Sequence, residues 1–393
     1  SIDGYAGTYN GWLWRPSETH HLAAAFDKIY GSHTFKFGME ARAYRENQYN
    51  PDHVSTGQFT FGTTWTRGPF DNSPAAPIGQ GLASMLFGLP TAGRVERRAS
   101  YAEQSTVWAL YVQDDWKVSR RLTATLGLRY EVEGPLTERF NRSVRGFDYD
   151  VVLPIEAQVK ANYAKNPTRE VPPEQFRVRG GLTFAGVGGL PRTLWERDAN
   201  NFMPRVGLSF KLTEKTVIRT GYGIFFGFLG VRRGDVIQTG FSETTQLIPS
   251  LDGGLTFRAT LANPFPDGIK EPVGAALGPM TFVGRGISFF NTKPLAPYMQ
   301  RWQFNIQREF PHRVVLDIAY VGNRGTHIET SRNLNALPVV YLSRTGERDQ
   351  PLINYLSANL PNPFYPLLPG TDRAGTLISR ATLLTAYPHF SSL

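Results

Sequence analysis

Cysteine is absent from the 393-residue sequence, so the chain can form neither a disulfide bond nor a thiolate-bound metal site. Long apolar runs are also absent. No segment approaches the roughly 18 apolar residues of a membrane-spanning helix, which excludes a helical membrane protein. Charged residues make up only 19% of the sequence, whereas a soluble globular protein carries about 25%. Aromatic residues (13%) and glycine (39 residues) are plentiful, which suits long strands joined by loops.

Basic residues outnumber acidic ones by 42 to 33, which gives a formal net charge of +9. Nucleic-acid binding requires lysine and arginine side chains that are clustered against phosphates. The basic residues of this chain are dispersed instead, and the densest runs are the adjacent pairs Arg97-Arg98, Arg120-Arg121 and Arg232-Arg233. We therefore expect no nucleic-acid partner.

Residues Leu122–Glu131 alternate between apolar and non-apolar side chains over all ten positions. Successive side chains of a strand point to opposite faces, so the segment predicts a strand with one apolar and one wet face. Its length matches a tilted strand that crosses a bilayer. Because the same alternation recurs along the chain, the sequence predicts an all-β, antiparallel transmembrane β-barrel in a bacterial outer membrane.

The alternating segments form four pairs, and each pair is joined by a short link, as β-hairpins require. The pairs are His21–Phe26 with Thr34–Tyr44, Val107–Trp116 with Leu122–Glu131, Pro204–Leu212 with Val217–Phe226, and Trp302–Phe310 with Val314–Val321. The links are Lys28–Ser32, Lys117–Arg121, Thr213–Thr216 and Pro311–Arg313. The polar residues expected on the inner face of these strands are Lys36, Glu40, Arg42, Arg129, Glu131, Arg205, Lys211, Arg219, Gln303, Gln307 and Glu309.

Long connections rich in proline, glycine and asparagine separate the hairpins at 45–105, 132–203 and 227–301. Short periplasmic turns that alternate with long extracellular loops are typical of outer-membrane barrels. We expect paired further strands inside these connections, for example at Gln58–Thr63, Leu255–Ala259 and Met280–Phe290, and any ligand contacts in the loops rather than on the strands. In GLASMLFGLP, the helical spacing of Leu82, Met85, Leu86 and Leu89 predicts an amphipathic helix that packs on a loop or the rim.

Aromatic residues lie within or at the ends of the predicted strands, where a barrel uses them as interfacial girdles. A soluble β-sandwich core would use the same residues and remains the alternative. The residues are Trp108, Trp116, Tyr130, Tyr222, Trp302 and Tyr320.

The sequence gives little evidence for a catalytic, metal-binding or phosphate-binding site. The neighbours His20-His21 and Asp114-Asp115 would each point to opposite faces of a strand, which disfavours a metal pair and paired acid–base catalysis. The glycine-rich segments FAGVGGLPRTLW and GYGIFFGFLG lack the lysine and serine or threonine of a phosphate-binding loop. We therefore predict no catalytic, cofactor-binding or metal-binding residue, and no enzyme. The sequence identifies no particular ligand-binding residue.

Three segments carry a family resemblance: YVQDDWKVSRRLTATLGLRYE, NNFMPRVGLSFKLTEKTVIRTGYGIFFG and MQRWQFNIQREFPHRVVLDIAYVGNRGTHI. They resemble the barrel of TonB-dependent outer-membrane receptors, above all the Oar-like group abundant in Acidobacteria. HTFKFGMEARAYRENQYN, GQFTF and GLASMLFGLP resemble the preceding barrel region of that group, so the similarity spans most of 20–335.

The resemblance implies a 22-stranded barrel, a plug domain, a periplasmic regulatory-like module and a segment that engages TonB. This sequence shows neither of the two domains nor the TonB segment, eight clear strands are too few to close such a barrel, and YPHFSSL at its end does not alternate. SIDGYAGTYNGWLW at its start has no basic and apolar signal segments. We expect residues 1–393 to be an internal portion of the barrel.

The predicted function is energised uptake of a large or scarce solute through the outer membrane. The expected partners are outer-membrane lipid, the TonB system through a plug outside this sequence, and an unidentified solute. Two alternatives stay open, a non-transporting adhesion or structural barrel and a soluble carbohydrate-binding β-sandwich.

Overall fold

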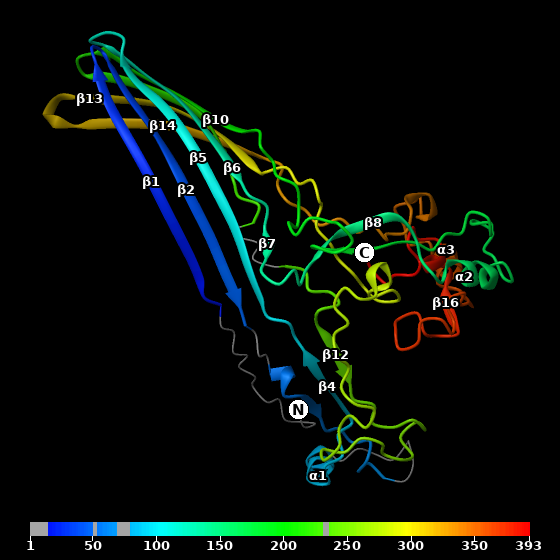
Figure 1. The fold of residues 1–393 in the computed structure, drawn as a ribbon. Helices are drawn as coiled ribbons and strands as arrows, with labels where there is room; N and C mark the ends of the chain where they lie inside the picture. Colours follow the sequence, from blue (N-terminus) through cyan, green and yellow to red (C-terminus); the bar gives the residue numbers. More distant parts are fainter. Residues whose placement is uncertain (1–14, 50–52, 69–78, 231–235) are drawn as a thin grey trace.

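The computed structural model describes residues 15–49, 53–68, 79–230 and 236–393. Eight long strands lie side by side in one antiparallel sheet (Figure 1). The long connections, together with residues 327–393 after the last of these strands, form two lobes at one end of the sheet. The order in the sheet follows the sequence: β1 (Ser17–Tyr30), β2 (His33–Gln48), β5 (Tyr101–Lys117), β6 (Leu122–Glu133), β10 (Asn201–Thr213), β11 (Thr216–Phe226), β13 (Tyr298–Glu309) and β14 (Val315–Thr326). The predicted all-β, antiparallel arrangement is confirmed. The sheet is open, with β1 and β14 at its edges.

The register of the sheet separates an apolar face from a polar face. Leu110, Tyr130 and Phe202 are opposite one another on β5, β6 and β10, and the next positions along these strands have the other orientation. The six aromatic residues predicted for girdles all lie on the apolar face, and the eleven polar residues predicted for the inner face all lie on the polar one. Leu110, for example, is 59% exposed at the protein surface. Such a two-faced sheet fits a wall between lipid and water.

The four short turns lie together at one end of the sheet (Figure 1). The predicted Lys28–Ser32 link is too long, because pairing continues to Tyr30 and His33 and leaves a two-residue turn. Gly31 occupies the left-handed region in this turn, with φ of 57°. Two-residue hairpins need such a conformation, which costs glycine little.

The further strands of the long connections lie outside the eight-stranded sheet, apart from β7 (Thr137–Glu138), which pairs with β5. The predicted strand at Gln58–Thr63 is reduced to β3 (Gln58–Thr60), which pairs with β4 (Ala92–Arg97) beside β12 (Glu243–Gln246). The predictions at Leu255–Ala259 and Met280–Phe290 are wrong, because both segments follow turns and irregular backbone. Tertiary packing of the loops, rather than alternation, decides their conformation.

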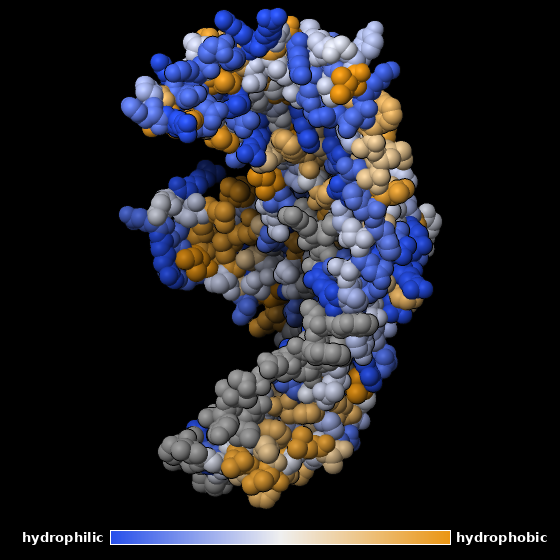
Figure 2. Space-filling view, turned by 90° about the vertical axis from the view of Figure 1, so that its left-hand side faces the viewer, coloured by the Kyte–Doolittle hydropathy of each residue, from blue (hydrophilic) through white to orange (hydrophobic). Residues whose placement is uncertain are grey.

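The predicted helix is α1 (Gln80–Leu86), but it does not pack through its apolar face. Its buried residues are Gly81 and Ser84, whereas Leu82, Met85 and Leu86 are exposed. The helix contacts the preceding segment through its backbone, where the Gln80 carbonyl oxygen accepts from the Thr66 hydroxyl at 2.7 Å, and its larger side chains stay outside. Hydrophobic residues accordingly gather on the surface at the lower end of the molecule, over the α1 lobe (Figure 2).

The largest hydrophobic core lies in the second lobe rather than along the sheet. There the stacked rings of Tyr163 and Phe176, with centroids 3.8 Å apart, pack among buried aliphatic and aromatic side chains. The elements of this lobe are β8 (Val144–Val152), α2 (Glu156–Tyr163), β9 (Arg179–Phe184), η2 (Gly278–Met280), α3 (Gln350–Ser357), β15 (Asn359–Pro361), β16 (Leu377–Ser379) and α4 (Arg380–Leu383). The remaining elements of the chain are η1 (His53–Ser55), η3 (Pro311–Arg313) and η4 (Val339–Tyr341).

The helices of the described residues are all too short or too polar to span a membrane.

We predict that an arginine on the apolar face of β13 destabilises the protein in lipid. Phe304→Arg should lower the free energy of unfolding from lipid vesicles by about 2–4 kcal/mol, because a charged side chain near the bilayer midplane is poorly solvated. Gln303→Arg, the adjacent residue on the polar face, is the matched control and should change it by less than about 1 kcal/mol. Equal effects of the two substitutions would contradict the assignment of the faces.

We also predict that acid destabilises the second lobe through His389. This side chain is fully buried with Nε2 3.4 Å from the carbonyl oxygen of Gly180, and burial lowers its pKa to about 4. In the unfolded chain the imidazole of His389 binds a proton near pH 6.5, whereas in the folded lobe it stays neutral down to about pH 4. The contribution of the neutral imidazole to the free energy of unfolding is therefore fully present above pH 6.5 and is lost as the pH falls toward 4. The loss amounts to about 3 kcal/mol, at roughly 1.4 kcal/mol per pH unit.

Denaturant unfolding at pH 7.5 and pH 4.5, followed by near-ultraviolet circular dichroism, measures this effect. His389→Gln removes the titrating group and should show a smaller decrease between the two pH values. An identical decrease in both proteins would assign the acid sensitivity to other groups.

Candidate functional site

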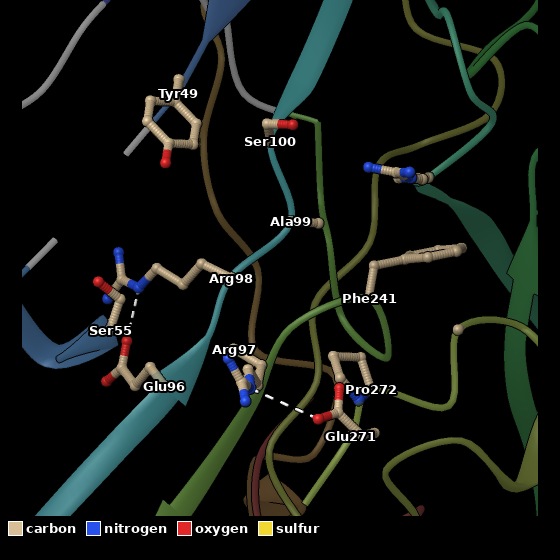
Figure 3. A pocket seen from close by; sticks show the side chains of 12 residues that line it. Tyr49, Ser55, Glu96, Arg97, Arg98, Ala99, Ser100, Phe241, Glu271 and Pro272 are labelled. Carbon is tan, nitrogen blue, oxygen red and sulfur yellow. Dashed lines mark hydrogen bonds and ion pairs between the residues drawn. The ribbon is translucent and has the colours of Figure 1, made fainter. Parts of the chain in front are cut away.

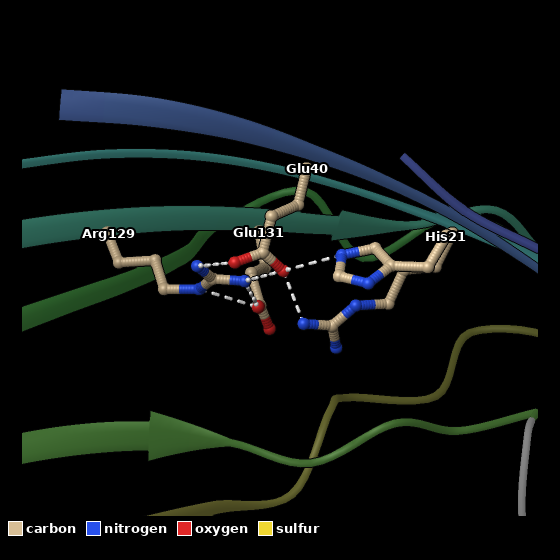
Figure 4. A network of polar contacts seen from close by, with 5 residues as sticks. His21, Glu40, Arg129 and Glu131 are labelled. Atoms are coloured by element: carbon tan, nitrogen blue, oxygen red, sulfur yellow. Dashed lines mark hydrogen bonds and ion pairs between the residues drawn. The ribbon is translucent and has the colours of Figure 1, made fainter. Parts of the chain in front are cut away.

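A network of charged side chains occupies the polar face of the sheet (Figure 4). Arg129 on β6 donates from Nη1 and Nη2 to the two carboxylate oxygens of Glu40 on β2, at 3.0 and 3.1 Å, and from Nε to Glu131 at 2.7 Å. The strand between them, β5, contributes the small side chain of Ala109 opposite both glutamates. A small residue at this position lets the long side chains of β2 and β6 meet across β5.

Further polar residues extend this network along the sheet. Arg42 also contacts Glu40, and His21 Nε2 lies 3.7 Å from the same carboxylate. Nearer the short turns, the carboxylate of Asp115 accepts from Lys36 at 2.9 Å and from Thr125 at 2.8 Å. Both groups of contacts lie on the polar face of the sheet.

The adjacent polar pairs of the sequence do point to opposite faces, as predicted. Asp114 pairs with His33 at 2.7 Å on the face opposite the Lys36–Asp115 pair. His20 contacts Glu18 at 3.5 Å, on the opposite side of β1 from His21. Within the described residues, no three histidine, aspartate or glutamate side chains are grouped closely enough to hold a metal.

A pocket of about 480 Å³ lies at the long-connection end of the strands, and we call it the arginine pocket (Figure 3). Segments from four parts of the chain converge there: the end of β2 with η1, the link from β4 to β5, the link from β7 to β8, and the connection around β12. The lining residues are Tyr49, Ser55, Glu96, Arg97, Arg98, Ala99, Ser100, Arg142, Phe241, Glu271, Pro272 and Gly274. A second pocket of about 360 Å³ adjoins it and shares Glu96, Arg98 and Ala99.

The arginines that line the two pockets form ion pairs of different strength with glutamates. Arg98 Nε lies 2.5 Å from the largely buried carboxylate of Glu96, and Arg285 Nη1 lies 2.9 Å from Glu243. Arg97 Nε instead lies 3.4 Å from Glu271, whose side chain is 71% exposed. An exposed ion pair of this kind contributes about 0–1 kcal/mol, so it opens readily.

The arginine pocket has no recognisable signal in the sequence. Arg97-Arg98 stand out in the sequence only as a basic pair, which directly follows Glu96. The segment FAGVGGLPRTLW forms a turn with positive φ at Gly186, Gly188 and Gly189, which accounts for its glycines without a phosphate. GYGIFFGFLG begins as part of β11. That ligand contacts lie in the long connections stays a prediction.

We predict that the Arg129–Glu40 pair stabilises the wall. A double-mutant cycle with Arg129→Gln and Glu40→Gln should give a coupling energy of about 1–3 kcal/mol, because both side chains are largely buried and hydrogen-bonded. The exposed Lys211–Glu214 pair at a turn is the control, and its coupling should stay below about 1 kcal/mol. Equal coupling energies for the two pairs, measured by unfolding in detergent, would contradict this role.

The chain has weak structural similarity to several solved outer-membrane proteins. The outer membrane transporter YddB from Escherichia coli is 9% identical with a TM-score of 0.38, over 79% of this chain and 26% of its own. The ferric-catecholate import receptor Fiu from E. coli K12 is 11% identical with a TM-score of 0.30, over 79% and 31%. The Serratia marcescens hemophore receptor HasR, solved with its hemophore HasA and heme, is 11% identical with a TM-score of 0.30, over 80% and 33%.

The chain thus spans between a quarter and a third of the length of these three structures. No curated protein matches its sequence. Residues 3–379 match the family described as the outer membrane beta barrel domain. This match covers nearly the whole chain and agrees with the antiparallel two-faced sheet, so the protein belongs to the outer membrane beta barrel domain family and resides in the bacterial outer membrane.

Proposed function

We propose that this chain forms part of the wall of a TonB-dependent transporter of the Oar-like type, which takes up a large or scarce solute. The observation that carries the proposal is the charged polar face centred on Arg129, Glu40 and Glu131. Charged groups at membrane depth require water or protein partners rather than lipid. A wall of this kind encloses a hydrated lumen that passes solute or holds a plug domain.

The open edges of the sheet support a larger barrel. In lipid, every backbone N–H and C=O group needs a partner, so a membrane-spanning sheet must be closed. β1 and β14 each pair with only one neighbour among the described residues. Further strands against both edges would complete the barrel, which fits the sequence resemblance to TonB-dependent receptors.

A non-transporting adhesion or structural barrel is the alternative function. Membership of the outer-membrane family removes the soluble β-sandwich from consideration. The alternative would leave the polar face without a transport role, and its long connections would serve attachment. We propose transport rather than adhesion or catalysis, because the polar network lies on the wall while an adhesin requires only its loops.

The gene of the full-length protein separates the two functions. A transporter should encode a plug domain and a TonB-binding segment upstream of this region. Deleting that gene and deleting the TonB gene should then cause the same growth defect under nutrient limitation. A full-length gene without a plug, or a gene deletion whose phenotype is unaffected by TonB, would favour the adhesion barrel.

We predict that the short turns face the periplasm and the long connections face outside. The chain has no cysteine, so single cysteines can be introduced at Ser119, in the β5–β6 turn, and at Asp267, in the β12–β13 connection. A membrane-impermeant maleimide on intact cells should label Asp267→Cys and leave Ser119→Cys unlabelled until the cells are opened. The reverse pattern would mean that the topology is inverted.

A further inference from the structure

We propose that the arginine pocket binds an organic carboxylate whose carboxyl group is attached to a flat apolar group. The pocket combines cationic side chains with the ring of Phe241 and lies at the long-connection end of the strands. Arginine is suited to this task because its planar guanidinium donates two parallel hydrogen bonds to a carboxylate. That the bound carboxylate proceeds into the barrel rests on the proposed transport function, whereas the binding itself does not.

Arg97 already holds a carboxylate, that of Glu271, in a form that a ligand can replace. The two side chains point toward one another across the pocket (Figure 3), with Arg97 Nε 3.4 Å from Glu271 Oε1. The arginine side chain is 49% exposed and the glutamate side chain 71% exposed, so water weakens the pair. A ligand carboxylate that approaches within 3 Å would form a stronger, charge-assisted contact than Glu271 does.

Arg142 supplies a second guanidinium to the same pocket. Its backbone N–H donates to Glu138 Oε2 at 2.7 Å, and the carboxylate of Glu138 is fully buried, which fixes this part of the link. The guanidinium carbon lies 4.8 Å from the centre of the Phe140 ring. In the part of the chain that the structure describes, this guanidinium has no carboxylate partner, so its outer N–H groups remain available to an anion.

The other arginines are committed to glutamates and make the site specific rather than broadly basic. The lining of the two pockets contains four arginines and three glutamates, which leaves one uncompensated positive charge. These residues are Arg97, Arg98, Arg142 and Arg285, and Glu96, Glu243 and Glu271. When a ligand displaces Glu271, the excess becomes two positive charges. This balance suits a ligand with one or two carboxylates and disfavours a polyanion.

Phe241 forms a rigid apolar wall of the pocket. Its ring meets the buried ring of Phe184 edge-on, with centroids 5.8 Å apart, so the second lobe holds it in place. The backbone beside it is fixed by the hydrogen bond from Gly274 N–H to the Gly240 carbonyl oxygen, at 2.8 Å. A flat apolar group of a ligand can pack on this ring while its carboxylate contacts the arginines.

Calorimetric titration of the full-length protein in detergent with benzoate tests the proposal. Benzoate should bind, whereas benzamide, its uncharged analogue, should bind at least tenfold more weakly. Inorganic phosphate should compete poorly, because it lacks the apolar group. Equal binding of benzoate and benzamide, or phosphate binding as tight as that of benzoate, would overturn the proposed ligand class.

Four variants, one of them a control, assign the binding to this pocket. Arg97→Gln and Arg142→Gln should each weaken benzoate binding at least tenfold, while Arg120→Gln, in the short β5–β6 turn at the opposite end, should leave it unchanged. Glu271→Gln should strengthen binding severalfold, because it releases Arg97, and a gain of affinity cannot result from misfolding. Unchanged or weaker binding by Glu271→Gln would overturn the displacement of Glu271.

The binding and transport proposals fail separately. If benzoate does not bind while the full-length protein still requires TonB for its growth phenotype, the pocket assignment is wrong and the transport function stands. If benzoate binds with the predicted variant effects but no TonB-dependent phenotype exists, the pocket assignment stands and the transport function is wrong.

Discussion

The need to pair every backbone N–H and C=O group inside lipid governs this structure. Strands meet that need only through neighbouring strands, so the eight long segments form an antiparallel sheet with short turns at one end. Because side chains alternate along each strand, this sheet separates an apolar face from a polar one. The charged network around Arg129 and the exposed apolar face around Leu110 are therefore two consequences of one constraint.

The largest hydrophobic core lies outside the membrane wall, in the long connections and the segment that follows β14. A strand whose apolar face meets lipid does not bury that face inside the protein, so compact packing is left to the lobes, where Tyr163, Phe176 and His389 are buried. The lobes in turn hold the arginine pocket at the end of the strands, with Phe241 supported by the second lobe. Wall and lobes thus supply different surfaces: a polar face on the sheet and a pocket between the loops.

Glutamate carboxylates fix several loops by accepting hydrogen bonds from backbone N–H groups. Glu133, at the end of β6, accepts from Leu229 and Gly230 at 2.6 and 2.7 Å, and Glu138 accepts from Ala102, Phe140 and Arg142. Both glutamates are buried, and a buried carboxylate requires such partners. These contacts anchor the β11–β13 connection and the β7–β8 link to the wall, and they place Arg142 at the pocket.

The sequence alone determined the strands, their pairing and their two faces, because alternation is a local property and adjacent strands meet through short turns. The eleven polar residues of the inner face, for example Lys36 and Glu309, and the aromatic residues of the apolar face, for example Trp302, could be assigned without coordinates. Tertiary structure alone decided the conformation of the long connections, including the exposed face of α1 and the irregular segments at Leu255–Ala259 and Met280–Phe290. It also brought Arg97, Arg142 and Glu271 together, since contacts between residues so far apart in sequence depend on how whole loops pack and leave no periodic signal along the chain.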